Sequence, residues 1–365
     1  MIKNRVEELA RNLKEAKLDA AAVLPSAGLY YLTGMTASLS ERPMLFIFGA
    51  DGQNAAVCPR FESERVRRDS GITTLYTYSD EEGAVAGFAR LREGFGAIAG
   101  LAMEYQAARV LEYMYLKEAC GVDNLVDLRP ILAEQRMKKD PSEVNKMQRA
   151  AVLADAVMGV LESNLRVGVT ERELVNIAQT FVKESKQGSM SFITVVAGER
   201  SALPHASVSD RPLQQGDAVV IDLGCYVEGY TSDITRSFNM GDQDEEMAKI
   251  GRIVLEANRL AKEAVKPGVS PSSLDKIARD YISGQGYGQY FTHRLGHGLG
   301  IEVHEEPYIV DGNDRVLEVG HAFTIEPGIY LPGQGGVRIE DDVCVTSTGC
   351  ISLTAYPREV KVIRR

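Results

Sequence analysis

Two stretches of the sequence, LQQGDAVVIDLG (residues 213–224) and LEVGHAFTIEPG (residues 317–328), align with each other without a gap. Both follow the pattern L-x-x-G-x-A-x-x-I-acid-x-G, so that Asp222 falls on Glu326. Each acid ends an apolar run that is typical of a buried β-strand. The match therefore predicts that one strand-containing unit is used twice in the chain.

A second pair of acids extends this match. Asp233 follows Gly229 by four residues, and Glu340 follows Gly336 by four residues. Two copies related by an approximate twofold axis would each send two acids to a common centre. The alternative is that any two β-hairpins with glycine turns look alike, but here each acid follows an apolar strand of the same length.

The segments before the two strands also match. GVTERELV (168–175) and GVSPSSLD (268–275) each predict a glycine loop, a hydroxyl residue that caps a helix, and the first turns of an amphipathic helix. The repeated unit therefore contains helices as well as strands.

The amino-terminal part of the chain has a different pattern. Apolar runs at 20–24, 43–49 and 55–59 predict strands, whereas the opening segment and the segment after Glu81 predict helices. We therefore expect a small α/β domain ahead of the repeated one.

A helix start marks the boundary between the two domains. Asp140 can cap a helix, Pro141 suits its first position, and Glu143 lies three residues after the cap. We place the boundary shortly before this helix, which gives a first domain of residues 1–132 and a second of residues 133–365.

Composition excludes several classes of protein. The chain has 365 residues and a formal net charge of −10, which argues against a nucleic-acid partner and suits a protein that gathers cations. Its five cysteines form no C-x-x-C pair, so we expect reduced thiols. The charged amino-terminal segment predicts a helix rather than a signal peptide, and no apolar run suits a membrane span, so we expect a cytoplasmic protein.

The four matched acids predict a metal site. A lone buried carboxylate is very costly, and four together repel one another unless cations hold them. The alternative is that each acid forms a separate salt bridge at a strand end, which is less plausible for four acids at matched positions.

The histidines point to the same part of the chain. All five lie in the second domain, and the segment from His293 to Pro307 contains three of them. His297 lies between two glycines, which predicts a loop where the backbone can approach a ligand closely. Carboxylates with one imidazole suit a pair of divalent cations such as Mn²⁺, Co²⁺, Fe²⁺ or Zn²⁺, which can share a water and hold it as a nucleophilic hydroxide.

A set of motifs resembles the aminopeptidase P and prolidase branch of the metallopeptidases with the pita-bread fold. The motifs of the second domain are PHASVS (204–209), IDLGCYVEGYTSDITR (221–236), HRLGHGLGIEVHEEP (293–307), TIEPGIY (324–330) and GVRIED (336–341). YYLTGM (30–35) and SERP (40–43) resemble that branch's creatinase-like first domain. The resemblance implies a small creatinase-like α/β domain followed by a pseudo-twofold pita-bread catalytic domain.

The resemblance also implies a ligand set for two divalent metal ions. Asp222 and Asp233 would bind one metal, with Asp233 also reaching the second. His297 and Glu326 would complete the other site, and Glu340 would bridge the two. Glu326 would in addition accept a proton from the bridging water.

Further residues acquire roles from the same resemblance. His205 and His304 would donate to the substrate carbonyl and the tetrahedral intermediate. His293 and Arg338 resemble substrate-side residues, and Arg338 lies two residues before a ligand acid, so both side chains would face one side of a strand. His321 matches no motif position, and we expect it to be structural.

The implied activity is hydrolysis of the peptide bond between an amino-terminal residue and a following proline. Its partners would be short peptides with proline at the second position, its metals Mn²⁺ or Co²⁺ with Zn²⁺ or Fe²⁺ as alternatives, and its assembly a homodimer. The segment at 26–28 departs from the family, because Ser-Ala-Gly stands where relatives often carry Asn or Asp. This leaves a first-domain contact to the substrate amine open.

Other activities remain possible on this fold. One is a peptide-binding module that has lost its metal ligands, although all five ligand positions are filled here. Another is a metal-independent creatinase-type or lyase reaction. The sequence leaves open whether the substrates are dipeptides or longer peptides.

Overall fold

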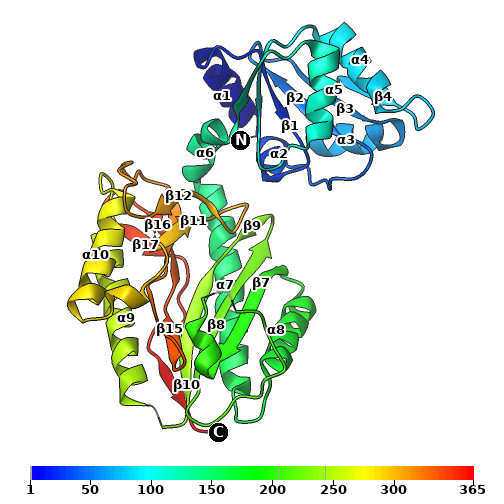
Figure 1. Cartoon of the computed structure of the whole chain (residues 1–365). Coiled ribbons are helices and arrows are strands. Elements are labelled where there is room, and N and C mark those ends of the chain that lie inside the picture. Colours follow the sequence, from blue (N-terminus) through cyan, green and yellow to red (C-terminus); the bar gives the residue numbers. More distant parts are fainter. Residues whose placement is uncertain (1, 205, 243) are drawn as a thin grey trace. The chain divides into compact units, whose positions relative to one another are not determined.

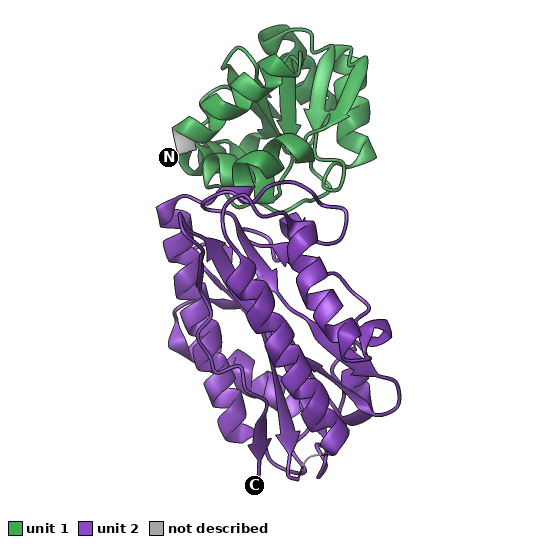
Figure 2. Cartoon of the chain, turned by 90° about the vertical axis from the view of Figure 1, so that its left-hand side faces the viewer, with its two compact units in different colours: residues 1–136 green, residues 137–365 purple. Residues whose placement is uncertain are grey.

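The computed structural model describes residues 2–204, 206–242 and 244–365. The chain divides into two compact units, residues 1–136 and 137–365 (Figure 2). The boundary predicted between residues 132 and 133 falls inside helix α6 (Arg129–Met137). Within the described ranges, no helix combines the length and apolar character that crossing a membrane requires.

Unit 1 is built on a six-stranded sheet in the order β4-β3-β2-β1-β5-β6. Its strands are β1 (Ala20–Val23), β2 (Leu45–Gly49), β3 (Asn54–Pro59), β4 (Leu75–Tyr78), β5 (Gly100–Met103) and β6 (Asn124–Asp127). The helices before α6 are α1 (Ile2–Glu15), α2 (Ala27–Thr33), α3 (Ser63–Ser70), α4 (Ala84–Phe95) and α5 (Val110–Cys120). Strands β1 to β3 fall on the three apolar runs, and helices α1 and α4 fall on the two segments predicted to be helical. The predicted strands and helices of this part are therefore confirmed.

Unit 2 opens with the long helix α7 (Pro141–Asn164). The side chain of Asp140 accepts hydrogen bonds from the backbone N–H groups of Ser142 and Glu143, and the Glu143 side chain accepts one from the N–H of Asp140. This capping box confirms the predicted helix start.

The rest of unit 2 forms two halves, each with a pair of helices packed on a sheet (Figure 1). The first half contains α7, α8 (Glu171–Ser185) and a sheet of β7 (Ser189–Ala197), β8 (Ala218–Val227), β9 (Tyr230–Thr231), β10 (Ile234–Met240) and β18 (Lys361–Ile363). The second half contains α9 (Glu245–Ala264), α10 (Pro271–Gly284) and a sheet of β11 (Gly296–Gly298), β12 (Glu305–Ile309), β13 (Ala322–Ile325), β16 (Asp341–Val345) and β17 (Cys350–Ser352). A separate ribbon pairs β14 (Gly328–Leu331) with β15 (Gly335–Arg338).

The predicted repeat is visible in the hydrogen bonds of the two halves. The N–H of Gly168 donates to the carbonyl of Leu213 at 2.8 Å, and the N–H of Gly268 donates to the carbonyl of Leu317 at 2.8 Å. In each half the leucine N–H returns a bond of 2.8 Å to the carbonyl of the valine that follows the glycine. A hydroxyl side chain then caps α8 in one half and α10 in the other. Matched bonds at matched positions confirm a pseudo-twofold domain.

The two halves differ at one place that concerns the acids. Strand β8 runs without interruption through Asp222, whereas the corresponding stretch of the second half is split into β13 and β14 at Glu326-Pro327. Proline has no N–H to donate to a neighbouring strand, which accounts for a break at this point. Asp233 and Glu340 each come directly before a strand, β10 and β16 respectively.

His321 supports the start of unit 2 and predicts a pH dependence. Its Nδ1 accepts the backbone N–H of Glu318 at 3.3 Å, and its backbone bridges to Lys138. Burial lowers the pKa of His321 to about 4. Since the unfolded chain takes up this proton first, the folded state should lose stability as pH falls from about 6.5 towards 4.

We therefore expect the free energy of unfolding to fall by on the order of 2 kcal/mol over this range through His321 alone, allowing for solvent screening. Urea unfolding at pH 7 and pH 4.5 of the wild type and of His321→Gln measures the difference. The free energy of unfolding of His321→Gln should change less between the two pH values than that of the wild type. An equal change in the two proteins would contradict this role of His321.

Candidate metal centre

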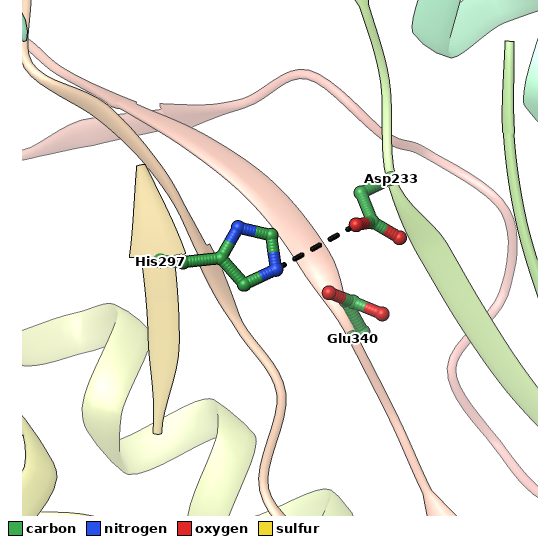
Figure 3. A group of neighbouring side chains, drawn as sticks. All are labelled: Asp233, His297 and Glu340. Carbon is green, nitrogen blue, oxygen red and sulfur yellow. Dashed lines mark ion pairs between the residues drawn. The ribbon is translucent and has the colours of Figure 1, made fainter. Parts of the chain in front are cut away.

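The second unit brings three of the predicted ligands together in its interior. Asp233, His297 and Glu340 each offer one ligand atom, and these atoms all lie within 4.8 Å of one another (Figure 3). The Nε2 of His297 lies 3.7 Å from Oδ2 of Asp233. All three residues are buried, and they come from separate segments of both halves.

The imidazole of His297 is held in the form that binds metal. Its Nδ1 lies 3.1 Å from the carbonyl oxygen of Gly298, so Nδ1–H donates there and the lone pair of Nε2 faces the acids. Burial, followed by the neighbouring His304, lowers the pKa of His297 to about 3. The ring is therefore neutral at ordinary pH, as metal ligation requires.

The loop predicted around His297 is wrong, because Gly296–Gly298 is the short strand β11, which lies between β12 and β13 in the sheet. A Cβ on Gly296 would lie 2.0 Å from the carbonyl oxygen of Thr324, and one on Gly298 would lie 2.1 Å from that of Glu306. The glycines therefore allow neighbouring strands to approach closely, rather than a ligand.

The remaining two predicted ligands also face this cluster. The Oε1 of Glu326 lies 3.4 Å from Nε2 of His297 and accepts the hydroxyl of Thr324 at 3.3 Å. Asp222 lies on β8, and its Oδ2 accepts a hydrogen bond from Nη2 of Arg338 at 2.7 Å. Burial raises the pKa of Glu326 most, and the charge of Asp222 adds to this rise, which places Asp222 in the same electrostatic field.

The centre carries more negative charge than the protein satisfies. Burial, and then repulsion by neighbouring carboxylates, raises the pKa of Asp233 and of Glu340 well above the usual range. Burial raises the pKa of Glu326 to about 7. Among the described residues, Oδ1 of Asp222, Oδ1 of Asp233 and Oε1 of Glu340 are buried without a hydrogen-bond partner.

These orphaned oxygens fit divalent cations. A cation would supply the missing positive charge, and each of these buried oxygens could coordinate it. Oxygen ligands with one imidazole nitrogen suit Mn²⁺, Co²⁺, Fe²⁺ or Zn²⁺.

The sequence interpretation missed two residues that connect the predicted ligands to the predicted substrate-side residues. The hydroxyl of Thr235 donates to Glu340 at 2.6 Å and accepts from Nε of Arg338 at 3.1 Å. The phenol oxygen of Tyr330 accepts from Nη1 of Arg338 at 3.0 Å and lies 2.8 Å from Nε2 of His293. Polar residues at every second position of apolar strands, such as Thr235 two after a ligand acid, are the pattern that could have found them.

The histidines assigned to the substrate side lie in different settings. The ring of His304 is exposed, and its centroid lies 4.2 Å from that of His297. His293 is half-buried, and its Nδ1 lies 2.8 Å from the carbonyl oxygen of Arg294. His205 lies outside the described residues.

Comparison with known proteins adds independent information. An uncharacterized peptidase of Staphylococcus aureus is 37% identical, and the match covers 97% of this chain and 99% of that protein. A prolidase from Thermococcus sibiricus superposes with a TM-score of 0.93 at 35% identity, covering 100% of this chain and 99% of that one. An Xaa-Pro dipeptidase from Bacillus anthracis gives a TM-score of 0.92 at 32% identity, with 100% of both chains covered.

Two family models account for most of the sequence. Residues 5–138 match the creatinase/prolidase N-terminal domain, which is the predicted creatinase-like first domain. Residues 145–347 match the model of metallopeptidase family M24, and this range contains every acid and histidine of the candidate centre. The chain is therefore a peptidase that belongs to metallopeptidase family M24.

Proposed function

We propose that this chain is a two-metal peptidase that hydrolyses the bond between an amino-terminal residue and a following proline, with Xaa-Pro dipeptides as its main substrates. The observation that carries the metal dependence is the set of buried carboxylate oxygens without a partner, which faces a neutral imidazole. The substrate class is supported by the similarity to the Thermococcus prolidase and the Bacillus Xaa-Pro dipeptidase.

Two divalent ions held by Asp222, Asp233, His297, Glu326 and Glu340 would supply a nucleophilic hydroxide at neutral pH and polarise the scissile carbonyl. Mn²⁺ and Co²⁺ are the proposed ions, with Zn²⁺ and Fe²⁺ as alternatives. The ligand assignment to each ion follows the family resemblance.

Glu326 is the proposed proton acceptor of the reaction. This role follows the family resemblance, and Oε1 of Glu326 lies 3.4 Å from Nε2 of His297, so the carboxylate borders the proposed metal ligands. The Thr324 hydroxyl at 3.3 Å orients one of its oxygens.

The substrate side is proposed to be formed by His304, His293 and Arg338. His304 is exposed beside the ligand His297, so its ring can donate to a substrate carbonyl. Arg338, Tyr330 and His293 form a hydrogen-bonded chain that holds three polar side chains in fixed positions. A bond before proline is a tertiary amide without an N–H, so its carbonyl oxygen is the group through which enzyme donors of this kind can hold it. His205 is proposed as a second donor.

The cytoplasmic location and the homodimer stay predictions.

The test compares Ala-Pro, Ala-Ala and Ala-Pro-Ala on enzyme stripped of metal and reloaded with Mn²⁺, Co²⁺ or Zn²⁺. We expect kcat/KM for Ala-Pro to exceed that for Ala-Ala by more than about tenfold, because a pocket shaped for the pyrrolidine ring discriminates at least this strongly. Comparable values for these two dipeptides would overturn the proline assignment. Faster turnover of Ala-Pro-Ala than of Ala-Pro would overturn the dipeptide assignment, and no dependence on added metal would overturn the metal proposal.

A further inference from the structure

One fully buried amide side chain lies behind the candidate metal centre. Asn258 belongs to α9 and has no solvent exposure. Its Nδ2 donates to the carbonyl oxygen of Ile325 at 2.9 Å and to that of Ile339 at 3.3 Å. These two carbonyls belong to the residues directly before Glu326 and Glu340, so a single nitrogen links the two backbone segments that carry these acids.

The Asn258 amide lies where strand pairing changes from β13–β16 to β14–β15. The ladder between β13 and β16 ends at the pair Ile325 and Asp341. The ladder between β14 and β15 begins at the pair Gly328 and Arg338. Both acids fall between these ladders, where the N–H of Ile339 donates to the carbonyl oxygen of Pro327 at 3.4 Å, and the Asn258 amide adds a further link between the two segments.

Arg358 determines which way the amide points. Its Nη1 donates to Oδ1 of Asn258 at 3.0 Å. Since an amide oxygen accepts and an amide nitrogen donates, this contact directs Nδ2 towards the two carbonyls. The Arg358 side chain is itself 33% exposed, and its Nε also lies 3.9 Å from Oδ2 of Asp341. That acid keeps Arg236 and Lys262 as partners when Arg358 is replaced.

We propose that Asn258 is a positioning residue that sets the separation of Glu326 and Glu340 for metal binding, and that Arg358 orients its amide. The inference rests on the proposed two-metal function. Ligands of a metal pair must be held to within about 0.5 Å, and a buried cross-link between their backbones does this without touching the ions. Asn258 would therefore act on metal affinity through the backbone alone.

The experiment measures Mn²⁺ binding to stripped enzyme by calorimetry for Asn258→Leu and Asn258→Asp. Leucine has a similar size but no donor, and aspartate keeps the contact to Arg358 while facing the two carbonyls with an oxygen. We expect the Mn²⁺ dissociation constant to rise about 10–100-fold for leucine, as for other residues that orient ligands, and by more for aspartate.

Val254→Ala is the matched control, because it removes buried atoms from the same helix one turn earlier and leaves both carbonyl contacts in place. It should lower the thermal stability of the stripped enzyme but change the dissociation constant less than about twofold. Arg358→Met should weaken Mn²⁺ binding in the same direction as Asn258→Leu but less, and Arg358→Lys should restore part of the loss.

The outcomes separate this inference from the proposed function. Wild-type Mn²⁺ affinity in Asn258→Leu would overturn the inference and leave the two-metal proposal standing. Equal losses in Asn258→Leu and Val254→Ala would also overturn it, because they would reflect general destabilisation. If Asn258→Leu does not fold, unchanged affinity in Arg358→Met would overturn the inference. A wild-type chain that binds no Mn²⁺ would overturn both.

Discussion

Glu340→Gln should reduce peptide hydrolysis to the limit of detection and reduce bound metal, yet the metal-free variant should be more stable than the metal-free wild type. The variant should lose function but gain metal-free stability, because the Glu340 carboxylate binds a cation when one is present and is a buried, uncompensated charge when none is. Its Oε1 is buried without a hydrogen-bond partner among the described residues, and burial raises its pKa well above the usual range. An ionised Glu340 therefore destabilises the metal-free fold at neutral pH.

Glutamine removes the charge and keeps the local structure. Its amide oxygen can still accept the hydroxyl of Thr235, which lies 2.6 Å from the native side chain. Mass spectrometry of the metal content checks the expected loss of bound metal. Thermal unfolding at pH 7.5 with and without added Mn²⁺ checks the expected gain in metal-free stability.

Glu318→Gln is the control, because the side chain of this exposed acid pairs with the surface residue Lys138 at 3.2 Å, and its replacement should change neither quantity. Full activity in Glu340→Gln would contradict the two-metal proposal. A metal-free variant less stable than the metal-free wild type would contradict the charge argument.

His304→Ala should lower kcat by about 10²–10³-fold while the metal content stays at the wild-type value, which is the usual cost of removing one donor from a developing oxyanion. His304 is an exposed residue whose ring lies 4.2 Å from that of His297, so it borders the candidate metal centre. In contrast, the ligand-atom cluster of Asp233, His297 and Glu340 does not include it.

The measurement pairs steady-state kinetics on Ala-Pro with metal analysis of the same sample. His321→Gln serves as the matched histidine control and should keep its turnover at pH 7, because His321 contacts the Glu318 backbone instead. Loss of metal in proportion to activity in His304→Ala would show that His304 is a ligand and not a donor.

Local sequence patterns predicted the repeat and its helix starts well. The two twelve-residue stretches align because both carry a buried strand, and the cap at Asp140 is defined by residues next to it. Such features depend on neighbours in the chain, so they can be recognised before folding brings distant parts together.

The features that sequence patterns missed depend on contacts between distant segments. The GHG segment is too short to show a strand period, and it becomes β11 only because β12 and β13 lie on either side of it. Thr235 reaches Glu340 from the other half of the unit, and Asn258 reaches two strand ends from a helix. A threonine or asparagine in an apolar segment does not by itself indicate which distant group it will bind.

The matched hydrogen bonds of the two halves have a consequence for ancestry. One half supplies two acids, so a protein made of a single copy could assemble the four-acid centre only by pairing with a second copy about a twofold axis. Joining the two copies in one chain removes the requirement that both change together. The strand break at Pro327 is such a change, because it occurs in one half while β8 stays continuous in the other. An asymmetric centre of this kind is open to a single chain with two halves, since a symmetric pair of identical chains would carry the same break twice.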